Sequence, residues 1–266
     1  MKNFYSLMSW MEARDAAAEH RVVILPIGTV DANGPLTPLG FDYLVSTALA
    51  EQAAERTGAL WMPGIAYGVS EALDSFSGTI SMPPEHLAAQ VDSIVGSLIR
   101  GGFTHILLIN NHGPNQYPVE YALRRIRRRT GVLVPSINPA QLSADLRGDI
   151  FGSDNSAIGH GSEPGVSLLM HLHPGSVDLN KAKARPKSNF QNFEVLNPME
   201  VRFGDSRVNM FLELSEVSAT AGWGDPTQAS AEKGEALFNA MLDFVVDFIP
   251  EFQKLDTKID PPEVSG

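Results

Sequence analysis

The stretch THILLIN, residues 104–110, decides how the rest of the sequence is interpreted. It is a short run of branched apolar side chains that follows directly on a Gly-Gly pair and Phe103. A run of this kind is typical of a strand that is buried on both faces, as in a parallel sheet. Residues 21–27, RVVILPI, have the same character and end at Gly28. We therefore predict two buried strands that belong to one mostly parallel sheet.

Longer amphipathic stretches alternate with the apolar runs. This alternation is typical of βαβ units, which place helices on both faces of a parallel sheet. The sequence predicts helices over 43–56, 84–100, 117–129, 163–172 and 228–252, and further strands over 59–65 and 132–137. Residues 143–162 are interpreted as an irregular loop, and 180–210 receive no assignment. No linker divides the chain, so residues 1–266 are expected to form a single α/β domain.

The composition of the 266 residues excludes several classes of protein. Hydrophobic residues make up 43% and charged residues 19%, which is the balance of a globular chain with a sizeable core. The 20 Lys and Arg against 31 Asp and Glu give a net charge of -11, which argues against nucleic acid as a partner. The chain has no cysteine, so disulfides and thiolate metal ligands are excluded. No signal peptide or membrane span is predicted, and a cytoplasmic location is expected.

Candidate ligands for a metal ion gather in three loops. Asp31, Asn33 and Asp42 lie in a Gly- and Pro-rich segment after the first strand, and His112 follows the strand at 104–110. Glu163 ends the motif GHGSE that closes the irregular loop. Ligands of open parallel sheets bind outside the carboxyl ends of the strands, where two of these loops must lie. A divalent cation held by these side chains is therefore our hypothesis.

Each of these residues also has an ordinary structural interpretation. Asp31 and Asp42 could cap a turn and a helix, and Glu163 could be a first-turn helix charge. The arginines of residues 124–129 favour a solvated helix face over an anion site, because no aromatic side chains interleave with them. Trp223 could either line a pocket or anchor the loop before the last helix. The combination of the loops, rather than any one residue, carries the metal hypothesis.

The chain resembles the creatininase (creatinine amidohydrolase) family. The resemblance rests on five segments that occur in the family's order: PIGTVDANGPLTPLGFD (26–42), SFSGTIS (75–81), ILLINNHGPN (106–115), GHGSEPGVS (159–167) and GWGDPTQASAEKG (222–234). It implies a three-layer α/β/α sandwich with a largely parallel sheet. It also implies hydrolysis of amide or cyclic amide bonds with one or two divalent ions of zinc, manganese or iron, and assembly as a hexamer.

The departures from the family motifs concern the ligands themselves. By resemblance, Asp31 stands where the family has a glutamate ligand, and Asn33 stands where it has a histidine. A second histidine of the same motif is replaced by Leu36, and the bridging carboxylate is kept as Asp42. His112 matches a ligand of the family, although two flanking glycines of its motif are replaced by Asn111 and Pro114. A histidine usual on the substrate side is missing at residues 71–73.

The third motif keeps two further residues of the family. By resemblance, His160 is a catalytic histidine and Glu163 is a metal ligand or base. Asp31, Asp42 and His112 would then hold one ion with a position open for water. A second ion would have Asp42, Glu163 and Asn33, a set of oxygen ligands that suits Mg²⁺ or Mn²⁺ better than Zn²⁺ and binds weakly.

Three functions remain open from the sequence. The preferred hypothesis is a metal-dependent hydrolase of a C–N bond in a small amide, cyclic amide or formamide. In this hypothesis His160, with an ordinary pKa near 6.5, protonates the leaving nitrogen. The second is non-hydrolytic chemistry, an isomerisation or elimination, on the same scaffold. The third is a protein without catalysis that has lost its metals.

Overall fold

A parallel sheet forms the centre of the molecule. In the computed structural model, which describes residues 2–152 and 155–258, the sheet has four strands in the order β2-β1-β3-β4. They are β1 (Val23–Ile27), β2 (Leu60–Trp61), β3 (Ile106–Asn110) and β4 (Ser136–Ile137). Every residue of β1 and β3 is buried, as their uninterrupted apolar sequences require. The prediction of an α/β fold with a parallel central sheet is confirmed.

The register of the sheet brings the loops of interest to one edge. β1 and β3 pair over their whole length, from Val23 opposite Ile106 to Ile27 opposite Asn110. β2 pairs with the other side of β1 through Leu60 and Trp61. The chain therefore leaves β2, β1 and β3 at the same edge of the sheet, and the segments that follow these strands are neighbours.

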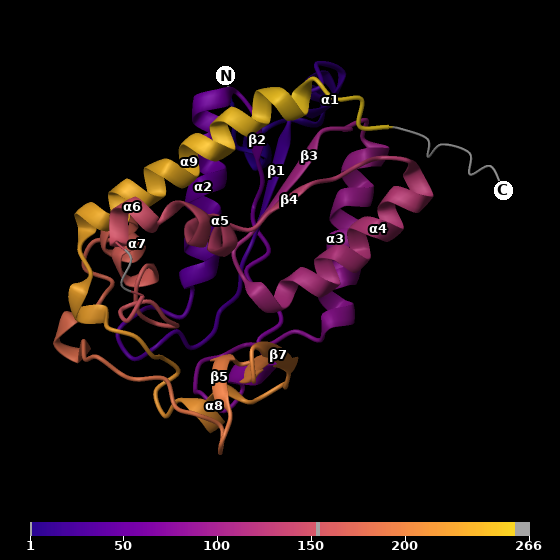
Figure 1. The fold of residues 1–266 in the computed structure, drawn as a ribbon. Coiled ribbons are helices and arrows are strands. Elements are labelled where there is room, and N and C mark those ends of the chain that lie inside the picture. The colour runs from indigo at the N-terminus through magenta and orange to yellow at the C-terminus, as the bar shows by residue number, and fades with distance from the viewer. Residues whose placement is uncertain (1, 153–154, 259–266) are drawn as a thin grey trace.

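Helices cover both faces of the sheet, so the fold has three layers (Figure 1). One layer contains α1 (Trp10–Ala18), α3 (Pro84–Arg100) and α4 (Gln116–Thr130), and the other contains α2 (Phe41–Thr57), α5 (Pro139–Leu146), α7 (Gly165–Leu172) and α9 (Ala231–Gln253). Successive strand residues face opposite layers, because side chains alternate along a strand. Leu108 therefore packs in the hydrophobic core beneath α1, α3 and α4, and Leu107 packs in the core beneath α2, α5, α7 and α9.

The long helices begin and end within three residues of the predicted bounds, and α3 matches them fully. α3 begins at Pro84, a residue favoured in the first turn, and ends at Arg100 before two glycines. α4 ends at Thr130 before Gly131, whose φ is +74°. Its arginines pair with carboxylates of this chain, since Arg124 contacts Glu120 and Arg129 contacts Asp92 on α3. These contacts agree with the interpretation of the arginine run as an exposed face of the helix.

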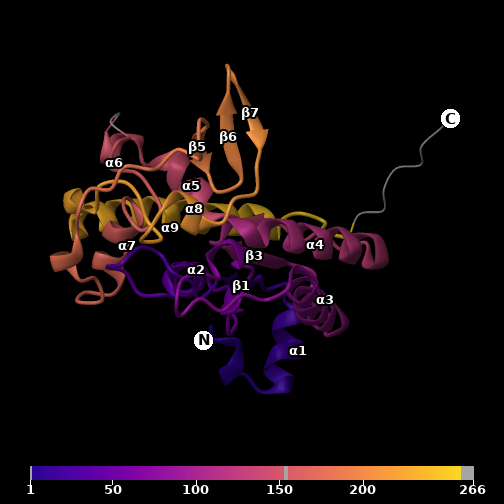
Figure 2. The same ribbon diagram turned by 90° about the horizontal axis from the view of Figure 1, so that it is seen from below.

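Residues 180–210, which had no assignment from the sequence, contain a small antiparallel sheet. Its strands are β5 (Glu194–Asn197), β6 (Glu200–Phe203) and β7 (Ser206–Asn209), in that order. The sheet projects from the body of the molecule near α8 (Leu214–Val217), as Figure 2 shows. Val195 and Val201 are its fully buried residues, whereas β7 is exposed throughout. This sheet lies beside the cavity described below.

Three predictions of local structure are corrected. The strand expected over 132–137 is reduced to β4, because Val132 bridges Lys258 and the amide of Leu133 donates to the carbonyl of Thr257. The irregular loop expected over 143–162 begins as helix, since α5 continues to Leu146 and α6 spans Gly148–Phe151. The strand expected over 59–65 is also short, and beyond β2 only an isolated bridge between Ile27 and Ile65 remains in the described chain. No helix among the described residues is long and apolar enough to cross a bilayer.

Candidate active site

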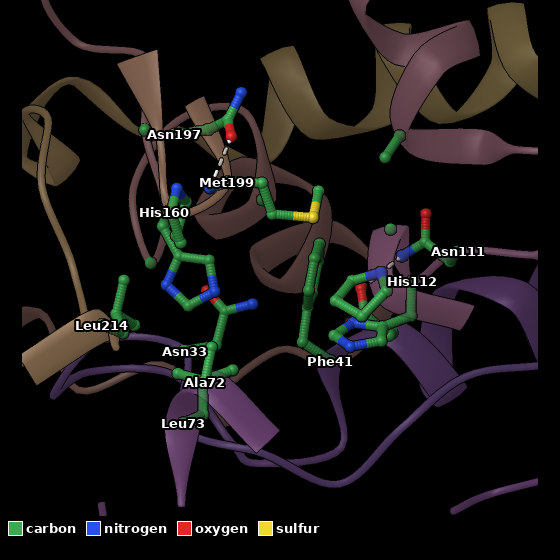
Figure 3. A pocket seen from close by; sticks show the side chains of 18 of the residues that line it. Asn33, Phe41, Ala72, Leu73, Asn111, His112, His160, Asn197, Met199 and Leu214 are labelled. Carbon is green, nitrogen blue, oxygen red and sulfur yellow. Dashed lines mark hydrogen bonds and ion pairs between the residues drawn. The ribbon is translucent and has the colours of Figure 1, made fainter. Parts of the chain in front are cut away.

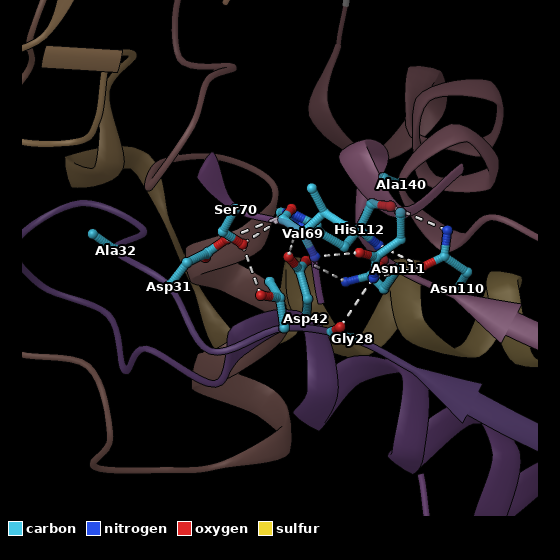
Figure 4. A network of polar contacts seen from close by, with 12 residues as sticks. Gly28, Asp31, Ala32, Asp42, Val69, Ser70, Asn110, Asn111, His112 and Ala140 are labelled. Atoms are coloured by element: carbon cyan, nitrogen blue, oxygen red, sulfur yellow. Dashed lines mark hydrogen bonds and ion pairs between the residues drawn. The ribbon is translucent and has the colours of Figure 1, made fainter. Parts of the chain in front are cut away.

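Three predicted ligands meet at the edge of the sheet where β1 and β3 end. Asp31 lies four residues after β1, Asp42 lies in the first turn of α2, and His112 lies two residues after β3. One ligand atom of each side chain lies within 4.8 Å of those of the other two, and all three residues are buried. We call these residues the Asp-Asp-His cluster. Figure 4 shows its polar contacts.

The imidazole of His112 has an acceptor at each nitrogen. Nδ1 lies 2.7 Å from Oδ2 of Asp42, and Nε2 lies 2.8 Å from the carbonyl oxygen of Val69. Burial by itself would lower the pKa of His112, but the hydrogen bond to Asp42 and the charges of Asp42 and Asp31 outweigh it and raise the pKa. Without a metal, the ring is therefore suited to hold both protons. A metal ion at this imidazole would have to displace one of them.

Asp31 is oriented by a serine that no sequence motif indicates. The hydroxyl of Ser70 donates to Oδ2 of Asp31 at 2.7 Å, and the same hydroxyl lies 2.8 Å from Oγ1 of Thr29. Burial, together with the charge of Asp42, raises the pKa of Asp31 to about 6, although His112 and Ser70 act in the opposite direction. A cation at the cluster would relieve the repulsion between the two carboxylates.

Asparagines complete the frame of the cluster. Nδ2 of Asn111 donates to Oδ1 of Asp42 at 3.0 Å, so both oxygens of this carboxylate have partners. Asn115 accepts from the amide of Val69 at 2.8 Å and donates to the carbonyl of Gly28 at 3.0 Å. It thereby joins the segments that follow β1, β2 and β3.

Ser70 lies in the segment GVSEAL, which has no motif or periodicity that would indicate a role at the site.

A cavity of about 520 Å³ opens beside the cluster. Asp42 and His112 lie in its wall, whereas Asp31 lies behind them and is not part of the lining. Asn33 and His160 lie in the same wall (Figure 3). The remainder of the lining is mostly apolar and includes Phe41, Leu168, Met199, Leu214 and Met241. Volumes of this size are typical of pockets that bind small organic molecules.

His160 faces this cavity in a defined tautomer. Its Nδ1 lies 2.7 Å from the carbonyl oxygen of Ala221, so Nδ1 donates and Nε2 is left as an acceptor. Burial lowers the pKa of His160, and the bond to Ala221 only partly offsets this effect. The expectation of an unperturbed pKa for this residue is therefore wrong. Trp223 stacks on the ring at 5.6 Å between centroids and is not among the lining residues, so it supports His160 from behind.

The backbone around Asn33 touches the backbone around His160. The amide of Gly34 donates at 2.8 Å to the carbonyl of Ala221, which also accepts from His160. Gly161 has a φ of +61°, and a Cβ there would lie 2.6 Å from Cα of Gly34. Only glycine allows this approach. It places the amide side chain of Asn33 in the cavity wall, where the family resemblance leads one to expect an imidazole.

Glu163 lies outside the Asp-Asp-His cluster. It is fully buried, and its Oε1 accepts a hydrogen bond from Ser167 at 2.9 Å and lies 3.8 Å from Nζ of Lys233. Its Oε2 has no hydrogen-bond partner among the described residues. Burial raises the pKa of this carboxyl group, although Ser167 and Lys233 act against it. The structure does not bring Glu163 together with Asp31 and His112, and its assignment as a catalytic residue and metal ligand stays a prediction.

Comparison with known proteins gives the family of this chain. The profile of the creatininase family, described as creatinine amidohydrolase, matches residues 6–249 of the chain. The chain belongs to the creatininase family. Among curated members, the creatinine amidohydrolase of Pseudomonas putida is 28% identical over 93% of this chain and 96% of its own. The mycofactocin precursor peptide peptidase of Mycobacterium tuberculosis is 29% identical over 83% of this chain and 81% of its own.

Solved creatininase structures share the fold of this chain. A mutant creatininase superposes with a TM-score of 0.77 at 26% identity, over 96% of this chain and 100% of the other. A second mutant creatininase, described as of the Zn-Zn type, superposes with a TM-score of 0.78 at 25% identity and the same coverage. The α/β sandwich of this chain is therefore that of the creatininases.

The Asp-Asp-His cluster has the donors that a divalent ion requires. Two carboxylates and one imidazole are suitable ligands for zinc, manganese or iron(II), and three protein ligands leave a position for water. Burial of two neighbouring carboxylates destabilises their charges in the absence of a cation. The donor set and its burial thus fit a metal ion, and they make a metal site the best interpretation of the cluster.

Proposed function

We propose that this member of the creatininase family is a metal-dependent hydrolase of a C–N bond in a small amide, cyclic amide or formamide. The observation that carries the proposal is the Asp-Asp-His cluster, which is buried and yet opens through Asp42 and His112 onto a cavity of about 520 Å³. Asp31, Asp42 and His112 would hold one ion of zinc, manganese or iron. Glu163 lies apart from them, so we propose one ion for each chain.

The metal and the protein have separate parts in this chemistry. When bound, the ion lowers the pKa of a water molecule and polarises the carbonyl group of the substrate. Ser70 and Asn111 hold Asp31 and Asp42 in place through hydrogen bonds, as partners of metal ligands usually do. The apolar part of the cavity wall excludes bulk water, which strengthens polar interactions inside it.

His160 is suited to transfer a proton within the cavity. Because its pKa is lowered, the ring is neutral at pH 7, and its Nε2 is free of the hydrogen bond that occupies Nδ1. We propose that Nε2 accepts the proton of the attacking water and then delivers it to the leaving nitrogen. This sequence differs from the simple acid suggested by the sequence, because a neutral imidazole must take up a proton before it can donate one.

The test is hydrolysis by purified protein loaded with Mn²⁺, Zn²⁺ or Fe²⁺. The substrates form a panel of small amides, lactams and formamides, and products are identified by mass spectrometry. The proposal predicts products that together contain one added water, and a loss of at least about a hundredfold in kcat for His160→Gln. No hydrolysis across the panel with any of the three metals would contradict it. A product of unchanged mass would instead support non-hydrolytic chemistry.

A further inference from the structure

The cavity extends from the Asp-Asp-His cluster to the far end of α5. Ala140 in the first turn of α5 and Arg147 just after its last turn both line it, as does His112. A helix rises about 1.5 Å for each residue, so Ala140 and Arg147 lie about 10 Å apart along the helix axis. The cavity is thus longer than a small cyclic amide, and its two ends have different chemistry.

Arg147 brings a positive charge to a mostly apolar wall. Among the described lining residues it is the one lysine or arginine. Its guanidinium donates to the amide oxygen of Asn155 at 3.3 Å, and it forms no ion pair with a described carboxylate. Two glutamates also line the cavity, and neither forms an ion pair with Arg147. Glu71 is exposed, and Glu213 caps the first turn of α8.

A second polar side chain of the wall lies on α5 and has no hydrogen-bond partner among the described residues. Ser143 lines the cavity one helical turn before Arg147, whose amide donates to the Ser143 carbonyl at 3.0 Å. The residue is buried, and its hydroxyl makes no hydrogen bond with any described residue. An unmade bond of this kind costs free energy, and a hydrogen bond from this hydroxyl to a ligand in the cavity would remove that cost.

Apolar side chains form much of the wall. Phe41 of α2, Leu168 of α7 and Met241 of α9 line the same cavity as the cluster and α5. These side chains offer no hydrogen bonds, so the part of a ligand that packs against them has to be apolar. A guanidinium with a neighbouring hydroxyl suits a carboxylate, which it can bind through two parallel hydrogen bonds.

We infer that the substrate is an amide with an apolar segment that ends in a carboxylate, and that Arg147, with Ser143, binds this carboxylate. The inference rests on the proposed function for the amide end of the substrate. The carboxylate end is recognised by the protein alone, since Arg147 and Ser143 are not part of the Asp-Asp-His cluster. Binding at that end can therefore be measured without metal and without turnover.

The test is calorimetric titration of the metal-free protein with two matched compounds. 6-Acetamidohexanoate has an amide, a pentamethylene segment and a carboxylate, and 6-acetamidohexanamide has a neutral amide in place of the carboxylate. We expect the carboxylate compound to bind at least about tenfold more tightly, because a charged hydrogen bond is lost in the other. Arg147→Gln is expected to remove this preference, and Arg147→Lys to keep part of it. Ser143→Ala should reduce it.

Arg128→Gln on the exposed surface of α4 is the matched control and is expected to retain the full preference. Equal binding of the two compounds by the wild-type protein, a preference that survives in Arg147→Gln, or no binding of either compound at millimolar concentration would overturn the inference. Hydrolysis of neutral amides in the metal-loaded panel would leave the proposed function standing in each of these cases.

Discussion

The ligands of the Asp-Asp-His cluster have their orientations fixed by partners that belong to the fold. Ser70 holds Asp31, Asn111 holds Asp42, and the carbonyl of Val69 holds His112. These partners come from the segments after β2 and β3. Since partners of metal ligands tune affinity as well as geometry, the cluster depends on residues that would never themselves bind a metal.

At the residue scale, removal of the Ser70 hydroxyl should weaken metal binding. Ser70→Ala takes away the donor to Asp31 and frees this carboxylate to rotate, so we expect the affinity for Mn²⁺ to fall about tenfold or more. Titration calorimetry measures this. Ser93→Ala, which removes an exposed hydroxyl on α3, is the control and should bind Mn²⁺ as the wild-type protein does. An unchanged affinity in Ser70→Ala would contradict the role of the Ser70 hydroxyl in holding Asp31 for the metal.

His160 should make the stability of the protein depend on pH. Its pKa is lowered on folding, so the unfolded chain binds more protons than the folded chain below about pH 6.5. The free energy of unfolding is therefore expected to fall as the pH drops from about 7.5 to about 5.5. His160→Gln should lose less stability over this interval than the wild-type protein. Urea denaturation at both pH values gives the comparison, and equal losses would contradict a lowered pKa.

At the scale of elements, α7 and α9 pack with their backbones in contact. A Cβ on Gly234 of α9 would lie 1.9 Å from the carbonyl oxygen of Ser167 on α7, so only glycine fits there. Gly234→Ala should lower the free energy of unfolding by about 2 kcal/mol or more, because the helices must separate. Gly148→Ala, which meets nothing within 4 Å, should change it by less than about 1 kcal/mol. Similar values in denaturant titrations of both variants would contradict this packing.

The sequence predicts those elements that contain their own start and stop signals. α3 has its proline at the start, glycines at its end, and apolar residues spaced along one face, so its bounds are predicted correctly. The strand expected over 132–137 is shortened because its first half pairs with residues near the C-terminus, a partner that local sequence does not specify. The small sheet of β5, β6 and β7 escapes prediction because few of its side chains are buried, and its apolar alternation is weak.

The site is predictable to the extent that parallel strands end at one edge. The places of Asp31, Asp42 and His112 after strands, together with the family resemblance, predict them as ligands, and the structure brings them together. The isolation of Glu163 is set by Ser167 and Lys233, which contact it from α7 and α9, and no motif indicates this. Ser70 and Arg147 lie in segments without a recognisable pattern, so their places follow only from the tertiary structure.

At the scale of the whole molecule, the sheet order β2-β1-β3 makes the site. It sets the segments after three strands next to one another, and the segment from Gly159 to Ser162, which precedes α7, lines the cavity. Binding of an ion that only the folded state can hold should stabilise the entire fold. We expect saturating Mn²⁺ or Zn²⁺ to raise the midpoint of thermal unfolding by several degrees. A thermal unfolding scan with and without metal checks this, and Asp42→Asn should show no rise.

The hexamer implied by the family stays a prediction, which sedimentation equilibrium can test.

The measurement that addresses the central claim most directly is the metal content of the purified protein after equilibration with Zn²⁺ or Mn²⁺ and removal of unbound ions. The account predicts one tightly bound ion for each wild-type chain, and close to none for Asp42→Asn and for His112→Asn. Asp205→Asn, an exposed carboxylate in the turn between β6 and β7, should retain the ion. Wild-type protein without bound metal, or cluster variants that keep a full equivalent, would contradict the assignment of Asp31, Asp42 and His112 as a metal site.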